Sequence, residues 1–228
     1  MKRLFVVLIA FASFTTVNAQ YRHGGGYGGG GGYSDGGSIG QIQFGIKGGL
    51  NLSTVNVSNG YDGYSYSTLA NFNAGVFLKI PVIRFFSFQP EVYYSGQGFR
   101  GVDGSTGFHY SEHVNYLNIP VLAKFTTRSG FFLETGPQLG LKLNAKDKEA
   151  GVSSDASAYY NSADFSWVFG AGFKIPMSPV AIDFRYNAGI TNVANDAQYG
   201  NGYGQYGVRN SVFQLDLMFI LWHASVKK

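Results

Sequence analysis

The sequence predicts an all-β fold, an eight-stranded antiparallel up-and-down transmembrane β-barrel with short periplasmic turns and four long outer loops. The main observation is an alternation of apolar and polar residues with period two that recurs along the chain. The second is a regular alternation of long and short connections between these segments. The third is a composition of 33 Gly, 16 Tyr and 20 Phe with only 13% charged residues, which favours strands and turns.

The composition also excludes several classes of protein. Hydrophobic residues make up 45% of the 228-residue chain, which is enough to form a core and excludes disorder throughout. The chain contains no Cys, so a disulfide scaffold and cysteine-ligated zinc, haem or iron–sulfur sites are excluded as well.

Residues 1–19 have the three parts of a secretory signal peptide. Lys2 and Arg3 precede an apolar run at 4–14, and a small-residue site ends at Ala19, where we expect cleavage. Residues 20–41 are dominated by Gly and Tyr, which predicts a flexible linker. No later segment reaches about 18 continuous apolar residues, so we expect no membrane-spanning helix.

The barrel is assigned to residues 42–223, and a basic C-terminal tail to 224–228. The alternating segments lie at 43–53, 71–80, 86–95, 116–125, 133–144, 164–175, 182–191 and 213–222. Short connections are expected at 81–84, 127–130 and 176–179, and long ones at 54–70, 96–113, 145–163 and 194–210. Because long and short connections alternate, all the long ones fall at one end, as in outer-membrane barrels.

Periodicity alone does not show which face points inward, because a secreted lipocalin-like barrel has the same alternation. The polar face contains many Gly residues, which suit the crowded interior of a small barrel. The apolar face carries almost no charge, and aromatic residues such as Phe131, Phe132 and Trp167 lie near strand ends, as in the girdles of membrane barrels. We therefore predict that the apolar face contacts lipid and that the polar face, which continues to Trp222, lines the lumen.

This orientation places basic and acidic side chains in the lumen in nearly equal number. They are Lys47, Lys79, Glu91, Lys124, Glu134, Lys142, Asp164, Lys174, Asp183, Arg185 and Asp216. Buried charges need partners, and the near balance of sign allows a structural network of ion pairs. Phe77, Tyr93, Tyr116 and Leu122 point the same way, so we expect a lumen filled by side chains rather than a wide pore.

Two motifs suggest chemistry that their context does not favour. His109, Glu112 and His113 match the H-x-x-E-H pattern of zinc hydrolases, which requires both His on one helical face, whereas here the motif lies in a loop that leads into a strand. Ser111, Glu112 and His113 are adjacent and cannot align as an acyl-transfer triad. We predict no catalytic residue, no metal site, no cofactor and no enzyme activity. A rim-located lipid- or peptide-modifying enzyme is the least favoured alternative.

The predicted outer loops are rich in Tyr, Gly, Asn and Ser, a composition typical of adaptable binding surfaces. The candidates for recognition are Tyr61, Tyr64, Tyr66, Tyr110, Tyr159, Tyr160, Tyr199, Tyr203 and Tyr206. The alternative, that these residues only cover the mouth of the barrel, stays open. No basic patch is expected on the outward face, which argues against nucleic acid as a partner.

Several motifs resemble those of the PorT-type outer membrane β-barrel family. They are GIKGGLN at 45–51, FQPEVYYSGQG at 88–98, YLNIP at 116–120, TGP at 135–137, GAG at 170–172 and RYNAG at 185–189. The resemblance covers about 42–222 and implies an eight-stranded outer-membrane barrel, usually without an assigned enzymatic function. The chain departs from the family in its Gly/Tyr-rich linker and in WHASVKK at 222–228.

Two roles follow from these expectations. The first is non-enzymatic and consists of envelope structure or surface recognition through the outer loops. The second, which the resemblance permits, is accessory work in protein export or assembly at the outer membrane. The expected partners are outer-membrane lipid and other envelope or secretion proteins, without nucleic acid, and the barrel is expected to be a monomer.

Overall fold

The computed structural model describes residues 40–58, 64–103, 108–149, 152–195 and 207–226. The predicted signal peptide and nearly all of the predicted linker lie outside the described residues. The elements are β1 (Gly40–Val57), β2 (Tyr64–Ile83), β3 (Phe86–Asp103), β4 (Phe108–Thr126), β5 (Phe131–Glu149), β6 (Val152–Asp155), the 3-10 helix η2 (Ser157–Tyr159), β7 (Ala163–Lys174), β8 (Val180–Gly189) and β9 (Val208–Val226). Period-two alternation produces these strands, since successive side chains of a strand point to opposite faces.

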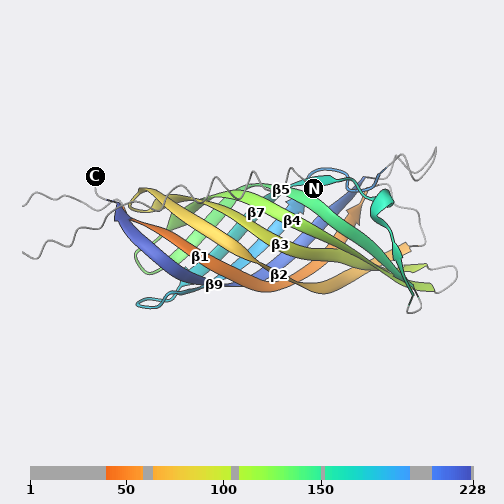
Figure 1. Cartoon of the computed structure of the whole chain (residues 1–228), viewed down its shortest axis with the longest axis horizontal. Helices are drawn as coiled ribbons and strands as arrows, with labels where there is room; N and C mark the ends of the chain where they lie inside the picture. Colours follow the sequence, from red (N-terminus) through yellow and green to blue (C-terminus); the bar gives the residue numbers. More distant parts are fainter. Residues whose placement is uncertain (1–39, 59–63, 104–107, 150–151, 196–206, 227–228) are drawn as a thin grey trace, which may run out of the picture. The chain divides into compact units, whose positions relative to one another are not determined.

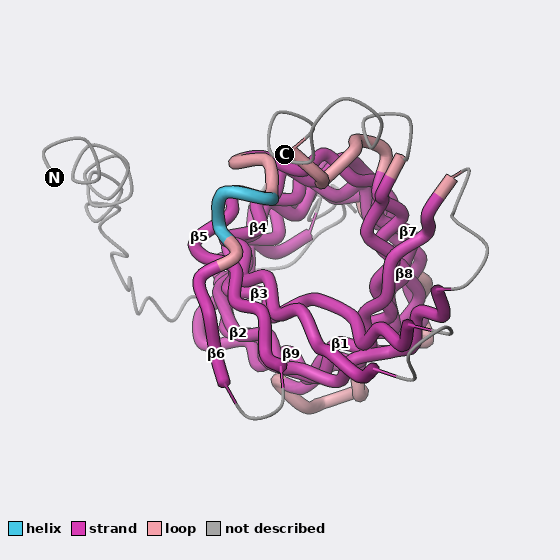
Figure 2. The backbone as a smooth tube through the Cα atoms, turned by 90° about the vertical axis from the view of Figure 1, so that its right-hand side faces the viewer, coloured by secondary structure: helices cyan, strands magenta, loops and turns pink. Residues whose placement is uncertain are grey.

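All the strands except β6 close into an antiparallel barrel in which neighbours in the chain are neighbours in the sheet. The first and last strands, β1 and β9, pair from Gly40↔Val226 to Val57↔Val208 and close the ring, which Figure 2 shows end-on. β6 pairs only with the end of β5, from Lys146 to Glu149. The predicted eight-stranded barrel is therefore confirmed, with β6 as an addition beside β5.

The two ends of the barrel differ in their connections. At one end, 84–85 join β2 to β3, 127–130 join β4 to β5, and 175–179 join β7 to β8. This turn end, at the left of Figure 1, also carries the start of β1 and the end of β9. The opposite loop end carries the connections that follow β1, β3, β5 and β8. In outer-membrane barrels the turn end faces the periplasm and the loop end faces outward.

The outer connections are shorter than predicted, because the strands continue into them. β1 ends at Val57 and β2 begins at Tyr64, while β3 and β4 leave only 104–107 between them. Most of the predicted loops at 54–70 and 96–113 is therefore strand, as is 145–149 of the next one. β9 likewise continues through 224–226, which was assigned to the tail. In most of these stretches the outward positions are polar, and apolar residues such as Val55, Phe99 and Val114 face inward instead, so the pattern of an apolar outward face ends there.

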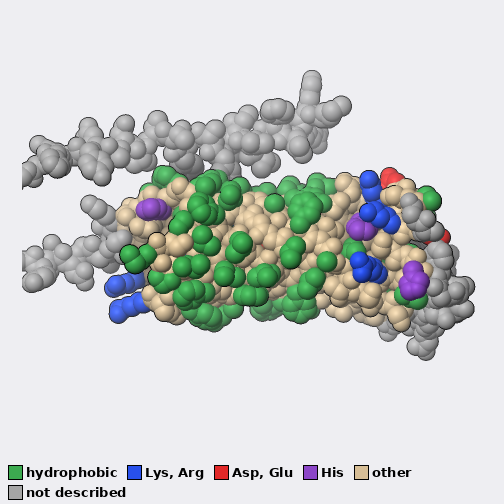
Figure 3. Space-filling model, turned by 90° about the horizontal axis from the view of Figure 1, so that it is seen from below, with side chains coloured by type: hydrophobic (Ala, Val, Ile, Leu, Met, Phe, Trp, Pro, Cys, Tyr) green, Lys and Arg blue, Asp and Glu red, His purple; other side chains and the backbone are tan. Residues whose placement is uncertain are grey.

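The apolar face of the barrel points outward, as predicted. Leu50, Phe213 and Leu217 are 60%, 59% and 60% exposed, whereas Lys47 and Asp216 at neighbouring inward positions are 4% and 0% exposed. On the face that Figure 3 shows, outward hydrophobic side chains cover the middle and the turn end of the barrel. A band of this kind is the lipid-contacting surface of a membrane barrel. No helix among the described residues is long and apolar enough to cross a membrane.

The strands extend past this band at the loop end. Leu52 of β1, Leu117 of β4 and Leu143 of β5 are the last large aliphatic residues of the band on their strands. Beyond them the outward positions are mostly polar or charged. We call the segments 53–57, 65–69, 97–103, 109–115, 144–149 and 208–211 the outer extension. The barrel wall therefore continues as β structure on the outer side of the lipid-contacting band.

The predicted positions of two aromatic residues are wrong. Phe132 is 1% exposed and lies in the lumen rather than in a lipid-facing girdle. Trp222 is 54% exposed and faces outward rather than into the lumen. The pairing of β1 with β9 shifts between Phe44↔Trp222 and Gly45↔Ile220, so Leu221 is an extra residue in β9. Such a β-bulge reverses the faces of every residue that follows it.

Candidate functional site

The centre of the lumen is an ion-pair hub on Glu91 of β3. Arg185 of β8 donates from Nη1 to Oε2 at 2.8 Å and from Nη2 to Oε1 at 2.7 Å. Lys47 of β1 donates to Oε2 at 3.1 Å, and Gln89 donates to Oε1 at 2.7 Å. The Lys47 ammonium group also lies 2.7 Å from Asp216 Oδ2 of β9. Because a bidentate Arg–carboxylate pair is strong and directional, the hub ties strands on opposite sides of the barrel together.

Arg185 connects the hub to a second group of charges. Its Nε lies 2.7 Å from Asp183 Oδ2 and 2.7 Å from Glu134 Oε1. Glu134 Oε2 in turn lies 3.0 Å from the ammonium group of Lys124, whose side chain is only 5% exposed. Burial of such ions costs several kcal/mol each unless they are paired. The ion pairs of the network therefore offset the cost of burying these charges, which a single unpaired ion could not do.

Neutral polar side chains fill the lumen between the hub and the loop end. Tyr93 Oη donates to Gln138 Oε1 at 2.6 Å, and Gln138 Nε2 donates to Ser166 at 3.0 Å. Asn73 Nδ2 donates to Asn51 Oδ1 at 2.9 Å, and Asn51 and Tyr93 are 0% and 1% exposed. An eight-stranded barrel has room for side chains and little else. The described residues thus close the lumen at this level with hydrogen-bonded side chains.

Four of the predicted lumen charges lie outside the network. Lys142 donates to backbone carbonyl groups of the segment that contains η2, and Asp164 accepts hydrogen bonds from two side chains near the loop end. Lys79 and Lys174 lie near the turn end, on β2 and β7. The alternation along the strands predicted that all of these side chains face inward. It could not predict which of them contact one another, because those contacts depend on the register between strands.

Within the outer extension, two carboxyl groups lie beside each other on the inward face. Glu112 of β4 is paired directly with Asp147 of β5, and the Tyr160 hydroxyl group donates to Glu112 Oε2. Burial, and then the Asp147 carboxylate, raise the pKa of Glu112 to about 7. Glu112 therefore changes its charge near neutral pH, in the mouth of the barrel and beyond the lipid-contacting band.

The outward face of the outer extension carries Arg100, His113, Lys146 and Lys148, which we call the outer basic patch. Cross-strand pairing sets His113 beside Lys146, and sets Arg100 and Lys148 on either side of Ser111. Burial, together with the positive charges of Lys148 and Arg100, lowers the pKa of His113. Figure 3 shows basic and His side chains near the loop end of the face in view. This patch corrects the expectation that no basic patch faces outward.

The outer basic patch was missed because its residues were assigned to two different loops, 96–113 and 145–163. As loop residues, Arg100, Lys146 and Lys148 have no defined neighbours. As residues of adjacent strands they share one face, since paired residues point to the same side of a sheet. The signal that could have found them is the alternation of charge along 144–149, where basic Lys146 and Lys148 flank acidic Asp147.

Residues 18–195 match the family described as outer membrane protein beta-barrel domain, which is well over half of the chain. The chain belongs to this family. As a member of the outer membrane protein beta-barrel domain family, it is an integral outer-membrane protein, in agreement with the outward apolar band and the polar lumen. No curated protein matches the chain.

Solved structures of outer-membrane proteins are similar to this family member at low identity. Neisserial surface protein A is 14% identical, with a TM-score of 0.49, and the match covers 79% of this chain and 98% of that one. Ail, the attachment invasion locus protein of Yersinia pestis, is 15% identical, with a TM-score of 0.43 over 80% of this chain and 99% of that one. OprG from Pseudomonas aeruginosa is 9% identical, with a TM-score of 0.37 over 80% and 94%. At these values the similarity supports no inference about function.

The candidate recognition Tyr residues of this outer-membrane barrel lie in different places. Tyr61, Tyr199, Tyr203 and Tyr206 lie outside the described residues, and Tyr64 is in β2 without a described side chain. Tyr66 of β2 and Tyr110 of β4 each pack edge-on against Phe99, with ring centroids 5.4 and 6.3 Å apart. Tyr159 of η2 is 44% exposed.

Tyr160 is a correction to the predicted recognition surface. It is 5% exposed, and it packs in a small core with Val114, Tyr116 and Val193 inside the outer part of the barrel. Its hydroxyl group donates a hydrogen bond to Glu112. The segment around η2 folds onto the barrel mouth and buries this side chain, which composition alone could not reveal. Tyr160 is therefore a packing residue.

The H-x-x-E-H motif lies in β4 and not in a loop. In a strand, alternate residues face opposite sides, so His109, Ser111 and His113 are on the outward face. Glu112 is on the inward face, where it pairs with Asp147. The barrel wall thus separates Glu112 from both His residues and from Ser111. The geometry supports neither a zinc set nor an acyl-transfer triad in this segment.

Proposed function

We propose that this protein is a non-enzymatic outer-membrane barrel with a closed lumen that serves envelope structure and surface recognition through its outer extension. The observation that carries the proposal is the Glu91 hub, in which Arg185 of β8 binds Glu91 of β3 on the opposite wall of the barrel and Lys47 of β1 also binds Glu91. Because these interior charges are paired with one another, the lumen is better suited to hold the barrel rigid than to let a solute pass. Binding of partners is then expected at the outer surface of the barrel, above all on the outer extension.

The outer basic patch supports recognition of acidic groups at the outer leaflet. Its side chains lie just past Leu117 and Leu143, where the apolar band ends. Basic residues at the edge of a lipid-contacting surface are attracted to anionic head groups by about 1 kcal/mol each. The partner proposed for this patch is therefore acidic outer-leaflet lipid. The monomeric state and the signal peptide at 1–19 are also part of the proposal.

The test measures the melting temperature of the full barrel in nanodiscs with a rising fraction of anionic lipid. We expect the wild type to be stabilised as that fraction rises, because a ligand that binds the folded state stabilises it. The double variant Lys146→Ser, Lys148→Ser should lose most of this gain. Lys146→Arg, Lys148→Arg is the matched control, since it changes the same two positions of β5 and keeps their positive charge. Equal gains in all three proteins would contradict the proposal.

The accessory role in protein export or assembly rests on the PorT-type resemblance. No contact among the described residues adds to it. Crosslinking in cells separates the two roles, because an export accessory should be trapped with periplasmic machinery at its turn end. A recognition protein should instead be trapped with lipid or with partners at its loop end.

A further inference from the structure

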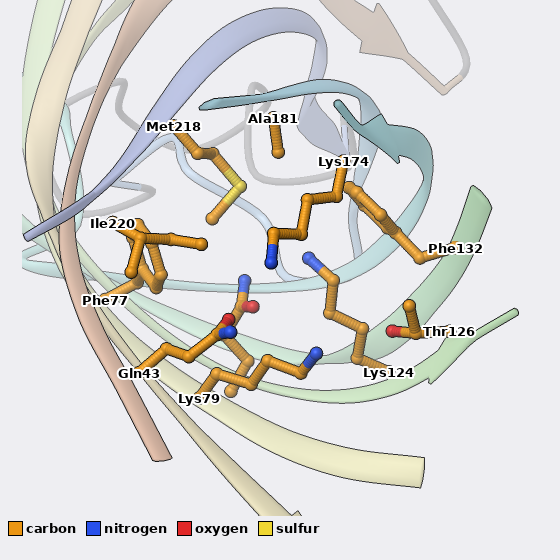
Figure 4. Close-up of a pocket in the computed structure, with 11 residues that line it drawn as sticks. Gln43, Phe77, Lys79, Lys124, Thr126, Phe132, Lys174, Ala181, Met218 and Ile220 are labelled. Carbon is orange, nitrogen blue, oxygen red and sulfur yellow. The ribbon is translucent and has the colours of Figure 1, made fainter. Parts of the chain in front are cut away.

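A cavity lies at the turn end of the lumen, below the ion-pair network. Figure 4 shows the ammonium groups of Lys79, Lys124 and Lys174 pointing toward one another across it. They come from β2, β4 and β7, and each lies within five residues of the end of its strand at the turn end. The open space at the centre has a volume of about 30 Å³. The cavity is thus placed to exchange with the periplasm rather than with the outer surface.

The charges around this cavity are not balanced by the residues that line it. Its lining contains three Lys and no acidic residue. Lys124 reaches Glu134 at 3.0 Å and also lies over the ring of Phe132, 3.5 Å from its centroid. For Lys79 and Lys174, the described part of the chain provides no carboxylate within ion-pair distance. Two positive charges therefore face the space without a partner, although buried or half-buried cations normally have one.

Two uncharged polar groups also face the cavity. Thr126 Oγ1 is buried and makes no hydrogen bond with any described residue. Gln43 is only 8% exposed, and its amide group is directed into the cavity. Buried polar groups are almost always satisfied by protein or by a bound species. These groups are independent of the Lys charges and point to the same space.

We propose that the turn end of the lumen is a binding site for a phosphate-class oxyanion. A tetrahedral dianion would balance the charges of Lys79 and Lys174, and Lys124 would add a third ammonium donor. Its oxygens would also accept hydrogen bonds from the Thr126 hydroxyl group and the Gln43 amide. Charge-assisted hydrogen bonds of this kind are about twice as strong as neutral ones. The same phosphate chemistry is offered by free inorganic phosphate and by the phosphate group of a lipid of the inner leaflet.

The proposed site predicts that loss of a Lys raises the melting temperature without phosphate and lowers it, relative to the wild type, with phosphate. Without an anion, the three ammonium groups repel one another across a partly desolvated space, which destabilises the fold. Lys79→Gln and Lys174→Gln should therefore raise the melting temperature in a phosphate-free chloride buffer. At saturating phosphate the order should reverse, because only the wild type retains the full set of donors. A purely structural Lys cluster would show the first effect without the reversal.

The experiment uses the full barrel in detergent at constant ionic strength. Equilibrium dialysis and melting curves with inorganic phosphate test the free ion, and the same curves with short-chain phosphatidic acid test the lipid. We expect saturable binding to one of these probes, weakened about tenfold or more in the Lys79→Gln, Lys174→Gln double variant, because two charge-assisted hydrogen bonds are lost and a tenfold change corresponds to about 1.4 kcal/mol. Arg84→Gln, at an exposed residue of the neighbouring turn, is the matched control and should bind as the wild type does.

The response to each probe identifies the source of the phosphate group. A response to phosphate alone assigns the site to the free ion, and a response to phosphatidic acid alone assigns it to lipid. Absence of saturable binding to both probes would overturn the proposal, as would unchanged binding in the double variant. Gln43→Leu and Thr126→Val provide a second set of variants that keep every charge. Each should weaken binding, and neither should lower the melting temperature in chloride, since an apolar side chain in the place of a polar group without a partner is neutral or stabilising.

Discussion

At the scale of single residues, Glu91 is the point where the lumen is most sensitive to change. Its two oxygens accept from Arg185, Lys47 and Gln89, and it is 2% exposed. Glu91→Gln keeps the shape but leaves a buried cation without its counter-charge, which we expect to cost about 3–5 kcal/mol in the free energy of unfolding. Unfolding by urea in detergent measures this. Glu149→Gln, at an exposed end of β5, is the control and should be near neutral.

Glu134→Gln extends the same test toward the turn end. Glu134 pairs with Lys124, which borders the cavity at the turn end, and with Arg185, which keeps Glu91 and Asp183 as partners. The loss should therefore be measurable but smaller than for Glu91→Gln, since solvent reduces the cost of an unpaired charge. Two variants as stable as the wild type would show that the pairs do not hold the interior together.

Glu112 gives the barrel a pH dependence that can be assigned to one group. In the folded chain its pKa is raised from 4.5 to about 7 by burial and by Asp147. A carboxyl group with a raised pKa favours the folded state in its protonated form. Its contribution is complete below about pH 4.5 and is lost as the pH rises through 7.

We expect the wild type to lose about 1–2 kcal/mol over this range relative to Glu112→Gln, after allowance for solvent at the barrel mouth. Urea unfolding curves at a series of pH values measure the difference. Glu149→Gln should keep the wild-type profile. A flat difference between the wild type and Glu112→Gln from pH 4 to pH 8 would contradict the assignment.

At the scale of elements, neighbouring Gly residues of β1 allow a matched test of lumen packing. A Cβ at Gly49 would lie 2.0 Å from the carbonyl oxygen of Leu215 and 2.4 Å from Asp216 Oδ1. A Cβ at Gly48 would meet only the Asn73 carbonyl oxygen, at 3.5 Å. Gly49→Ala should cost about 1–3 kcal/mol by overpacking. Gly48→Ala should be neutral or stabilise by up to about 1 kcal/mol, since Gly weakens a strand. Equal melting temperatures for the two variants would contradict the close approach inside the barrel.

The strands themselves could be predicted wherever one face touches lipid, because apolar side chains then recur at every second position. This is why the middle of each strand was found and the outer extension was not. Trp222 marks another limit, since the bulge at Leu221 leaves no local sign and reverses the faces after it. Phe132 shows that an aromatic residue near a strand end can serve as a lumen residue, here under the Lys124 ammonium group.

At the scale of the whole molecule, the interior is organised in levels along the barrel axis. Polar and aromatic packing around Tyr116 fills the outer part, the Glu91 hub fills the centre, and the Lys-lined cavity lies at the turn end. The sequence could point these side chains inward, since burial follows alternation. It could not give their partners, because residues such as Lys47 and Glu91 are 44 positions apart and meet only through the closed sheet. Lys79 and Lys174 at the cavity also come from strands that meet only in the closed barrel, so their lack of acidic partners could not be predicted from the sequence.

Closure of the lumen at these levels leads to a prediction about conduction. An eight-stranded barrel has an interior only as wide as its side chains. Here Tyr93 and Leu122 are 1% and 0% exposed, and the hub lies between opposite walls. We therefore expect no steady large-conductance current when the wild-type barrel is inserted into planar bilayers, with a wider porin-class barrel as the positive control. Stable open currents from the wild type would show that the interior moves aside as a unit. Such currents, together with a Glu91→Gln variant as stable as the wild type, would contradict the closed lumen and favour a transport function.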